Sequence, residues 1–323
     1  NALVDDAYFN TAELEAAFRL DLILPVVDTQ LNIEEPNIVG HNVRITSQVD
    51  VGEQVTPIVK LAGSQLTRED RLALFSADRA DVQILADRVV IGRNDDIDVI
   101  ATGILDVSAG RHAYVGSEED ITLGSFNAQD KAQLNTSGAI DTTDATGTFS
   151  GTDLVIEAAG GAIASAARPL ALSIASGGAV AARALDGIYL TAPSGDLVFS
   201  EVFTPGHVAL LAERGNIKRQ GNPAPVDLTA GGVTLRAGGV IGSNGFTVQI
   251  TDNNGLVDAV SDGDLDLTVT GGPITVRQIA SKGGALTLNV AEGGMTLLHP
   301  ADAAVAATLF GATSATITSD GVI

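Results

Sequence analysis

The acidic residues with the clearest spacing for metal chemistry are three aspartates at alternating positions, Asp262, Asp264 and Asp266. Carboxylate oxygens at a turn are ligands that Ca²⁺ accepts. No Gly-Gly-x-Gly-x-Asp nonapeptide accompanies them, and the glutamate that completes an EF-hand loop is missing. Two interpretations therefore stay open: a calcium site, or acidic turn residues that face water. The sequence indicates no other cofactor.

Residues that could cleave a polysaccharide are scattered along the chain. Glycosidases use two carboxyl groups, one as acid and one as base or nucleophile. Asp95 and Asp96 form such a pair in the sequence, but His207 and the basic residues Lys218 and Arg219 lie far from it. The four histidines show no metal-ligand spacing; they are His41, His112, His207 and His299. We therefore expect no catalytic residues and no enzymatic activity.

Composition excludes several other classes of function. The formal net charge is −22, which repels nucleic-acid phosphates and anionic lipids. There is no cysteine, so the chain has no disulfide framework and no thiolate metal site. Hydrophobic residues make up 45% of the chain, which is enough to build a core and too much for a disordered acidic chain. The absence of cysteine does not by itself fix the redox compartment of the protein.

The apolar residues occur in short runs that predict β-strands. Examples are Leu154-Val155-Ile156, Ile188-Tyr189-Leu190 and Val233-Thr234-Leu235, and Gly, Asp, Asn, Ser or Pro separates such runs. None is long enough to span a membrane as a helix. Residues 66–78 differ, because Thr67 is a good N-cap and acidic residues follow it. We expect a short helical insertion there.

Internal repetition predicts the architecture. Residues 97–114 match residues 172–189 without a gap at an offset of 75, so that Tyr114 falls on Tyr189. A third copy follows, which divides residues 97–323 into copies of about 76 residues at 97–172, 173–250 and 251–323. Within a copy, the apolar runs that begin at 170, 188, 208 and 226 recur about every 19 residues.

A period of about 19 residues fits one circuit of a parallel β-helix, in which small and β-branched side chains stack in a narrow core. We therefore expect an all-β parallel solenoid, in which residues 1–96 form an N-terminal β-helical segment with the helical insertion. A β-sandwich is the alternative, although it would not explain near-gapless copies. Because the third copy stops at residue 323 while the second continues past the matching point, we also expect a longer array.

These circuits resemble the haemagglutinin-type repeats of filamentous-haemagglutinin-like bacterial adhesins. The phrase VDLTAGGVTLRAGG at 226–239 carries the resemblance, and Gly160-Gly161-Ala162-Ile163 and Gly215-Asn216-Ile217 have the same style. The resemblance covers residues 97–323 and, more loosely, the first 96. It implies a right-handed β-helical shaft that is exported and displayed at the cell surface.

The resemblance implies a structural or adhesive role in a large bacterial surface or secreted protein. The expected partners are a host or neighbouring cell surface, extracellular matrix or glycans, and further copies of the chain in a filament. The alternative is a polysaccharide-binding or polysaccharide-degrading β-helix of the pectin-lyase-like kind. Such an enzyme would need one irregular circuit with convergent carboxylates, whereas the copies are uniform in sequence.

Overall fold

The computed structural model describes residues 36–53, 56–62, 82–85, 88–93, 96–143, 147–221, 226–298 and 309–322. These residues form an all-β parallel solenoid, so the expected fold class is confirmed. They contain no helix. The helical insertion expected at 66–78 lies outside the described residues, as does the position of His299.

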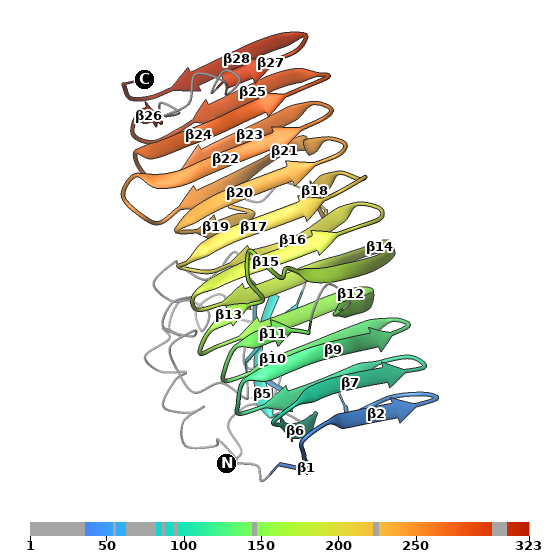
Figure 1. The fold of residues 1–323 in the computed structure, drawn as a ribbon. Helices are drawn as coiled ribbons and strands as arrows, with labels where there is room; N and C mark the ends of the chain where they lie inside the picture. Colours follow the sequence, from blue (N-terminus) through green and yellow to red (C-terminus); the bar gives the residue numbers. More distant parts are fainter. Residues whose placement is uncertain are drawn as a thin grey trace.

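The solenoid contains two columns of parallel strands, each column being a series of strands from successive circuits that pair with one another (Figure 1). In each circuit the chain passes through both columns. Column 1 contains β2 (Val43–Ser47), β7 (Ile104–Ala109), β9 (Ile121–Ala128), β11 (Ile140–Thr142), β13 (Ala162–Ile163), β15 (Gly187–Ala192), β17 (His207–Ala212), β20 (Gly232–Ala237), β22 (Gly255–Ser261), β24 (Ile274–Ser281), β26 (Met295–Leu297) and β27 (Leu309–Gly311). Column 2 contains β1 (Ile38–Gly40), β6 (Ile97–Ala101), β8 (Ala113–Ser117), β10 (Lys131–Thr136), β12 (Thr148–Ala158), β14 (Leu170–Ala184), β16 (Leu197–Phe203), β18 (Ile217–Arg219), β19 (Leu228–Ala230), β21 (Ile241–Ile250), β23 (Leu265–Thr270), β25 (Ala285–Val290) and β28 (Ser314–Ser319). The first parts of the long strands β12 and β14 also pair with column 1 strands.

The core of column 1 is a stack of β-branched side chains, each paired with the next circuit. The stack runs Ile121, Ile140, Ile163, Ile188, Val208, Val233, Val257 and Val276. All eight are at most 1% exposed. Branched side chains fit a pleated, buried surface, and repeating them in every circuit fills the same volume each time. The short apolar runs of the sequence therefore become a continuous core.

Circuit length is the main difference from the sequence-based expectation. The mean spacing is about 22 residues rather than 19. Some steps do match the shorter period, such as the pairing of Ala113 with Ala132. Others are longer, because loops are inserted at the corners, as between Ile163 and its partner Ile188. The division into 76-residue copies stays a prediction. Its first boundary falls inside β14, where Leu172 and Ser173 on either side of it both pair with β12.

A separate three-stranded antiparallel sheet interrupts the first circuit. It is formed by β3 (Thr56–Ala62), β4 (Val82–Leu85) and β5 (Arg88–Arg93). Consequently β2 pairs with β7 although this whole insertion separates them in the sequence, as in the pair Val43 and Leu105. Within the expected N-terminal segment 1–96, β1 and β2 thus belong to the solenoid, whereas β3 to β5 do not.

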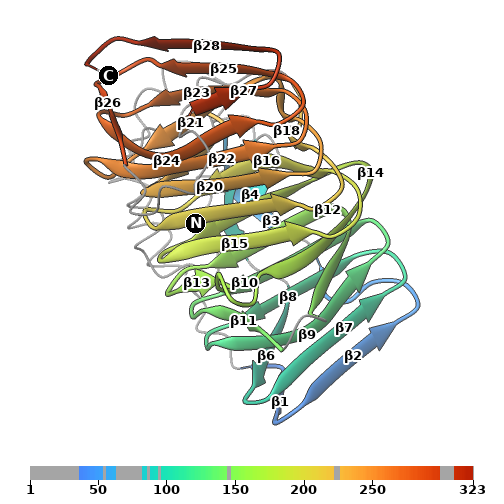
Figure 2. The ribbon, with the colours of Figure 1, turned by 45° about the horizontal axis from the view of Figure 1, so that its top comes forward.

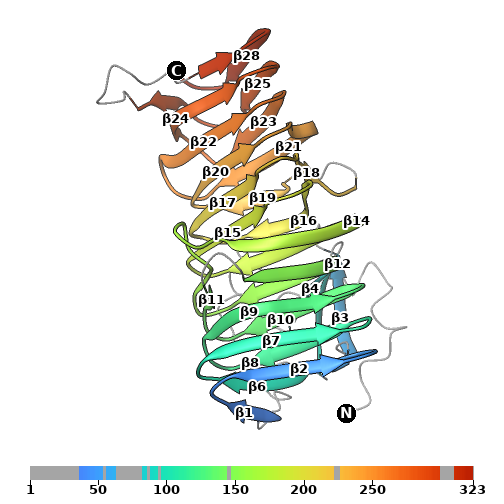
Figure 3. The ribbon, with the colours of Figure 1, turned by 45° about the vertical axis from the view of Figure 1, so that its right-hand side comes forward.

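The three-stranded sheet lies against the outer face of column 2. β4 contacts β12 and β14, and β3 and β4 are seen beside β12 in Figures 2 and 3. Correspondingly, β8 and the second halves of β12 and β14 are buried on both faces, unlike β17 or β23, where buried and partly exposed residues alternate. This explains why the run Leu154-Val155-Ile156 is apolar at consecutive positions.

Candidate functional site

The three aspartates expected to bind calcium are engaged in different ways. Asp262 and Asp264 lie in the turn between β22 and β23, and Asp266 lies on β23. Oδ1 of Asp262 accepts a hydrogen bond from Nζ of Lys282 (3.0 Å), and Oδ1 of Asp264 accepts one from the backbone N–H of Ala285 (2.8 Å). Burial raises the pKa of Asp266 above its ordinary value. Among the described residues, no group of three or more His, Asp or Glu side chains is placed to hold a metal ion.

The structure keeps the residues considered for polysaccharide cleavage apart. His207 opens β17 in column 1, whereas Lys218 and Arg219 belong to β18 in column 2. Asp96 is buried immediately before β6, several circuits away, and Asp95 lies outside the described residues. These groups therefore do not converge on one substrate position.

Charged side chains instead join segments of the solenoid. Arg219 Nε lies 2.5 Å from Oδ1 of Asp227, whose side chain is 1% exposed; this pair lies within one circuit, because β18 and β19 both pair with β16. Near the N-terminal end of the solenoid, Arg111 after β7 pairs with Asp50 after β2, in the neighbouring circuit. The Arg111 hydrogen bond is the largest cause that lowers the pKa of Asp50 to about 2. The Asp50–Arg111 pair therefore links one circuit to the next, whereas the Arg219–Asp227 pair closes a loop within one circuit.

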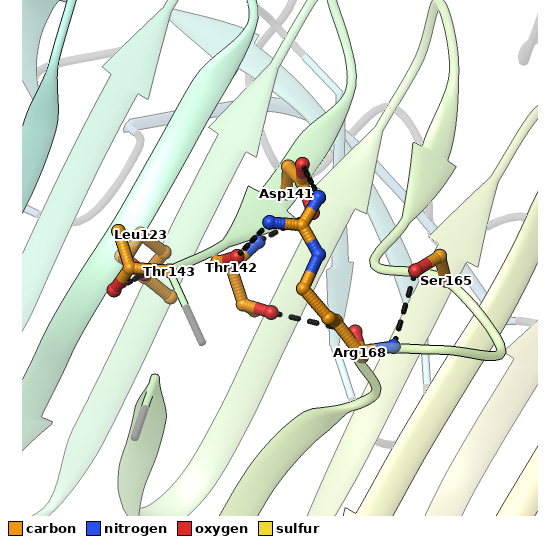
Figure 4. Close-up of polar contacts among 6 residues, drawn as sticks. All are labelled: Leu123, Asp141, Thr142, Thr143, Ser165 and Arg168. Atoms are coloured by element: carbon orange, nitrogen blue, oxygen red, sulfur yellow. Dashed lines mark hydrogen bonds and ion pairs between the residues drawn. The ribbon is translucent and has the colours of Figure 1, made fainter. Parts of the chain in front are cut away.

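A polar corner between β13 and β14 shows how the longer circuits are held (Figure 4). Arg168 reaches back across the corner, donating to the carboxylate of Asp141 (2.5 Å) and to the carbonyl of Thr142 (3.0 Å). The backbone N–H of Arg168 also bonds to Oγ of Ser165 (3.2 Å), and Ala164 has a φ of 60°. These contacts close the corner loop onto the preceding circuit, so this group has a structural role.

The most unusual polar group lies on the outer side of column 1 and is named here the Asp258 cluster: Tyr189, His207, Thr234, Arg236, Asp258 and Arg277. Asp258 on β22 points outward, yet its side chain is 0% exposed. Two guanidinium groups from the flanking circuits cover it. Arg236 Nη2 lies 2.7 Å, and Arg277 Nε 2.6 Å, from the same carboxylate oxygen, Oδ2. The other oxygen, Oδ1, is buried without a hydrogen-bond partner.

A local irregularity of β24 produces this arrangement. The pairing of β22 with β24 shifts between Val257 and Asp258, since Val257 pairs with Val276 but Asp258 pairs with Gln278. Arg277 is therefore the extra residue of a β-bulge, and its side chain emerges beside Asp258. Bulges commonly re-aim a side chain in this way.

The preceding circuits add aromatic and hydroxyl groups to the cluster. The register continues from Tyr189 through Ala209 and Thr234 to Asp258. A ring nitrogen of His207, Nε2, lies 3.0 Å from the hydroxyl of Thr234, and the His207 and Tyr189 rings are 6.4 Å apart between centroids. Burial lowers the pKa of His207, and the charge of Arg277 lowers it further, against an opposing effect of Asp258.

Sequence reasoning missed this cluster for a geometric reason. Arg236 and Asp258 are 22 residues apart and Asp258 and Arg277 are 19 apart, so a fixed period does not align all three. The one signal in the sequence that could have indicated the cluster is a charged residue next to a buried apolar run in each of three successive column 1 strands: Arg236, Asp258 and Arg277.

Comparison with known proteins identifies no relative. No family model matches the chain, and neither a curated protein nor a solved structure is significantly similar to it.

Proposed function

We propose that the chain is a rigid, non-enzymatic shaft segment of a large bacterial cell-surface or secreted protein, similar in kind to the filamentous-haemagglutinin-like adhesins. The observation that carries the proposal is an unbroken line of paired positions along column 1. It passes from Arg44 through Asp106, Ser125, Thr148, Ala171, Thr191, Leu211, Arg236, Val260 and Ala280 to Phe310.

Circuits that stack at a constant distance are suited to a rigid spacer, because the length of the protein then grows with the number of circuits. At an inter-strand distance of about 4.8 Å, the ten steps from Arg44 to Phe310 extend about 48 Å. Each circuit contacts only its neighbours, so length is added by adding circuits without redesigning the core. The net charge of −22 favours solubility and opposes association between exposed strand edges.

The alternative, a polysaccharide-degrading β-helix, gains no support from the site residues. Asp96 precedes β6, His207 lies on β17 and Lys218 lies on β18, so the three residues do not face a common position. The described residues include no helix that could cross a membrane. From the resemblance to surface adhesins we propose a contact or spacing role outside the cell, with a host or neighbouring cell, matrix or glycans as partners.

Two measurements on the natural host test this proposal. Antibodies against the folded chain should label intact, unpermeabilised cells or the culture medium, and a cytoplasmic marker should stay unlabelled as the control. Electron micrographs of the full-length product should show thin rods. Labelling only after permeabilisation, or compact particles, would contradict the proposal.

A further inference from the structure

The Asp258 cluster is locally positive on a strongly acidic chain. Two guanidinium groups, Arg236 and Arg277, share the single carboxylate of Asp258, which leaves one excess positive charge against a chain total of −22. Both arginines bond to the same oxygen, so their like charges are held close together. A negatively charged group placed between their outer edges would relieve that repulsion.

The arginines are also positioned to receive such a group. The side chain of Arg277 is 55% exposed and that of Arg236 is 33% exposed, whereas Asp258 beneath them is fully buried. Arg277 donates to Asp258 through Nε and Nη2, so Nη1 is not used in that ion pair. A guanidinium fixed from below by a buried carboxylate is pre-organised to bind carboxylate or sulfate oxygens from above.

Neighbouring groups favour a sugar as the carrier of the anionic group. Tyr189, His207 and Thr234 lie on the preceding circuits of the same outer face, and all three residues are only partly buried. An aromatic ring with adjacent hydroxyl and imidazole groups offers both an apolar face and hydrogen bonds. A free inorganic anion would use the arginines alone.

We infer that the Asp258 cluster binds an acidic polysaccharide, with Arg236 and Arg277 holding a carboxylate or sulfate of one sugar and Tyr189, His207 and Thr234 contacting the next part of the chain. This inference specifies one of the partners in the proposed function, glycans, and rests on that part of it. The shaft role does not depend on the inference, because a stiff spacer needs no ligand. The inference gives the column 1 face a defined binding position.

Calorimetric titration of the full chain tests the inference with four probes: a sulfated heparin oligosaccharide, an oligogalacturonate, a neutral glucan oligosaccharide and sodium sulfate. We expect one or both acidic oligosaccharides to bind, more weakly as salt is raised, and the neutral glucan not to bind. Binding of only one of the two acidic probes would identify sulfate or carboxylate as the recognised group. Failure of both to bind, or sulfate binding as tightly as they do, would overturn the inference.

Matched variants separate the cluster from the general effect of charge. Arg277→Gln should weaken binding about tenfold or more, since a charge-assisted hydrogen bond is lost. Arg277→Lys, which keeps the charge and can still pair with Asp258, should weaken it less. Arg44→Gln removes the same charge from an exposed arginine that pairs with Asp106 near the other end of the same column, and should change affinity less than about twofold. Equal losses in Arg277→Gln and Arg44→Gln would refute a specific site.

Discussion

The stacked pair Phe126 and Phe149 tests the register of the core. Both side chains are 0% exposed, their ring centroids are 4.7 Å apart, and their planes differ by 16°. The two residues pair directly, whereas a circuit of the shorter length expected from the sequence would place Phe126 opposite a residue that precedes Phe149. Replacing either by alanine removes a fully buried aromatic ring, so each variant should lose about 3–5 kcal/mol in the free energy of unfolding.

The double variant carries the sharper test. Because the two rings contact one another, the loss in the free energy of unfolding of the double variant, Phe126→Ala with Phe149→Ala, should differ from the sum of the two single losses by about 0.5–1.5 kcal/mol. Urea unfolding followed by circular dichroism measures each value. The control combines Phe149→Ala with Phe246→Ala, because Phe246 packs against Phe199 and not against Phe149. In this control the two single losses in the free energy of unfolding should add within about 0.5 kcal/mol. Additive losses in the Phe126 and Phe149 pair would refute the assigned register.

Three further predictions concern the links between circuits. The pKa of Asp50 is lowered from 3.8 to about 2, so the stability that comes from its pair with Arg111 should be present above pH 3.8 and disappear as the pH falls toward 2. The difference in the free energy of unfolding between wild type and Asp50→Asn should therefore shrink over that range. Gly206→Ala should cost about 1–3 kcal/mol, since a Cβ there would lie 1.8 Å from a backbone oxygen, and an unchanged thermal midpoint would contradict that contact. Arg168→Ala should cost no more than about 1 kcal/mol in urea unfolding, because both partners in its ion pair are 46% exposed; a loss of several kcal/mol would assign the corner a larger role.

The sequence was informative where each circuit repeats the same physical solution. Ile188 and Val233 stand in apolar runs separated by turn residues, and both occupy the buried stack of column 1. Every circuit must fill the same narrow core. The sequence therefore has short β-branched runs, glycine at the corners and few aromatic residues. Together with the internal repetition of residues 97–114 at 172–189, these features predicted the parallel solenoid.

Features that depend on a single circuit could not be predicted in this way. The loop closed by Arg168 lengthens one circuit, and the repeat period of the sequence does not indicate where such a loop occurs. The partner of the covered face of β12 and β14 is an antiparallel sheet inserted far earlier in the chain. The Asp258 cluster requires a bulge that turns Arg277 outward, and bulges follow from pairing between circuits rather than from the residues of one strand.

The most direct test of the stacked shaft is a pair of distances along column 1. The chain has no cysteine, so introduced cysteines can be spin-labelled at single positions. Arg44→Cys with Phe310→Cys spans ten steps, and Thr148→Cys with Phe310→Cys spans seven. Pulsed electron resonance should give narrow distributions near about 48 Å and about 34 Å, apart from the label linkers. Broad distributions, or a longer pair no more distant than the shorter, would contradict the regular shaft.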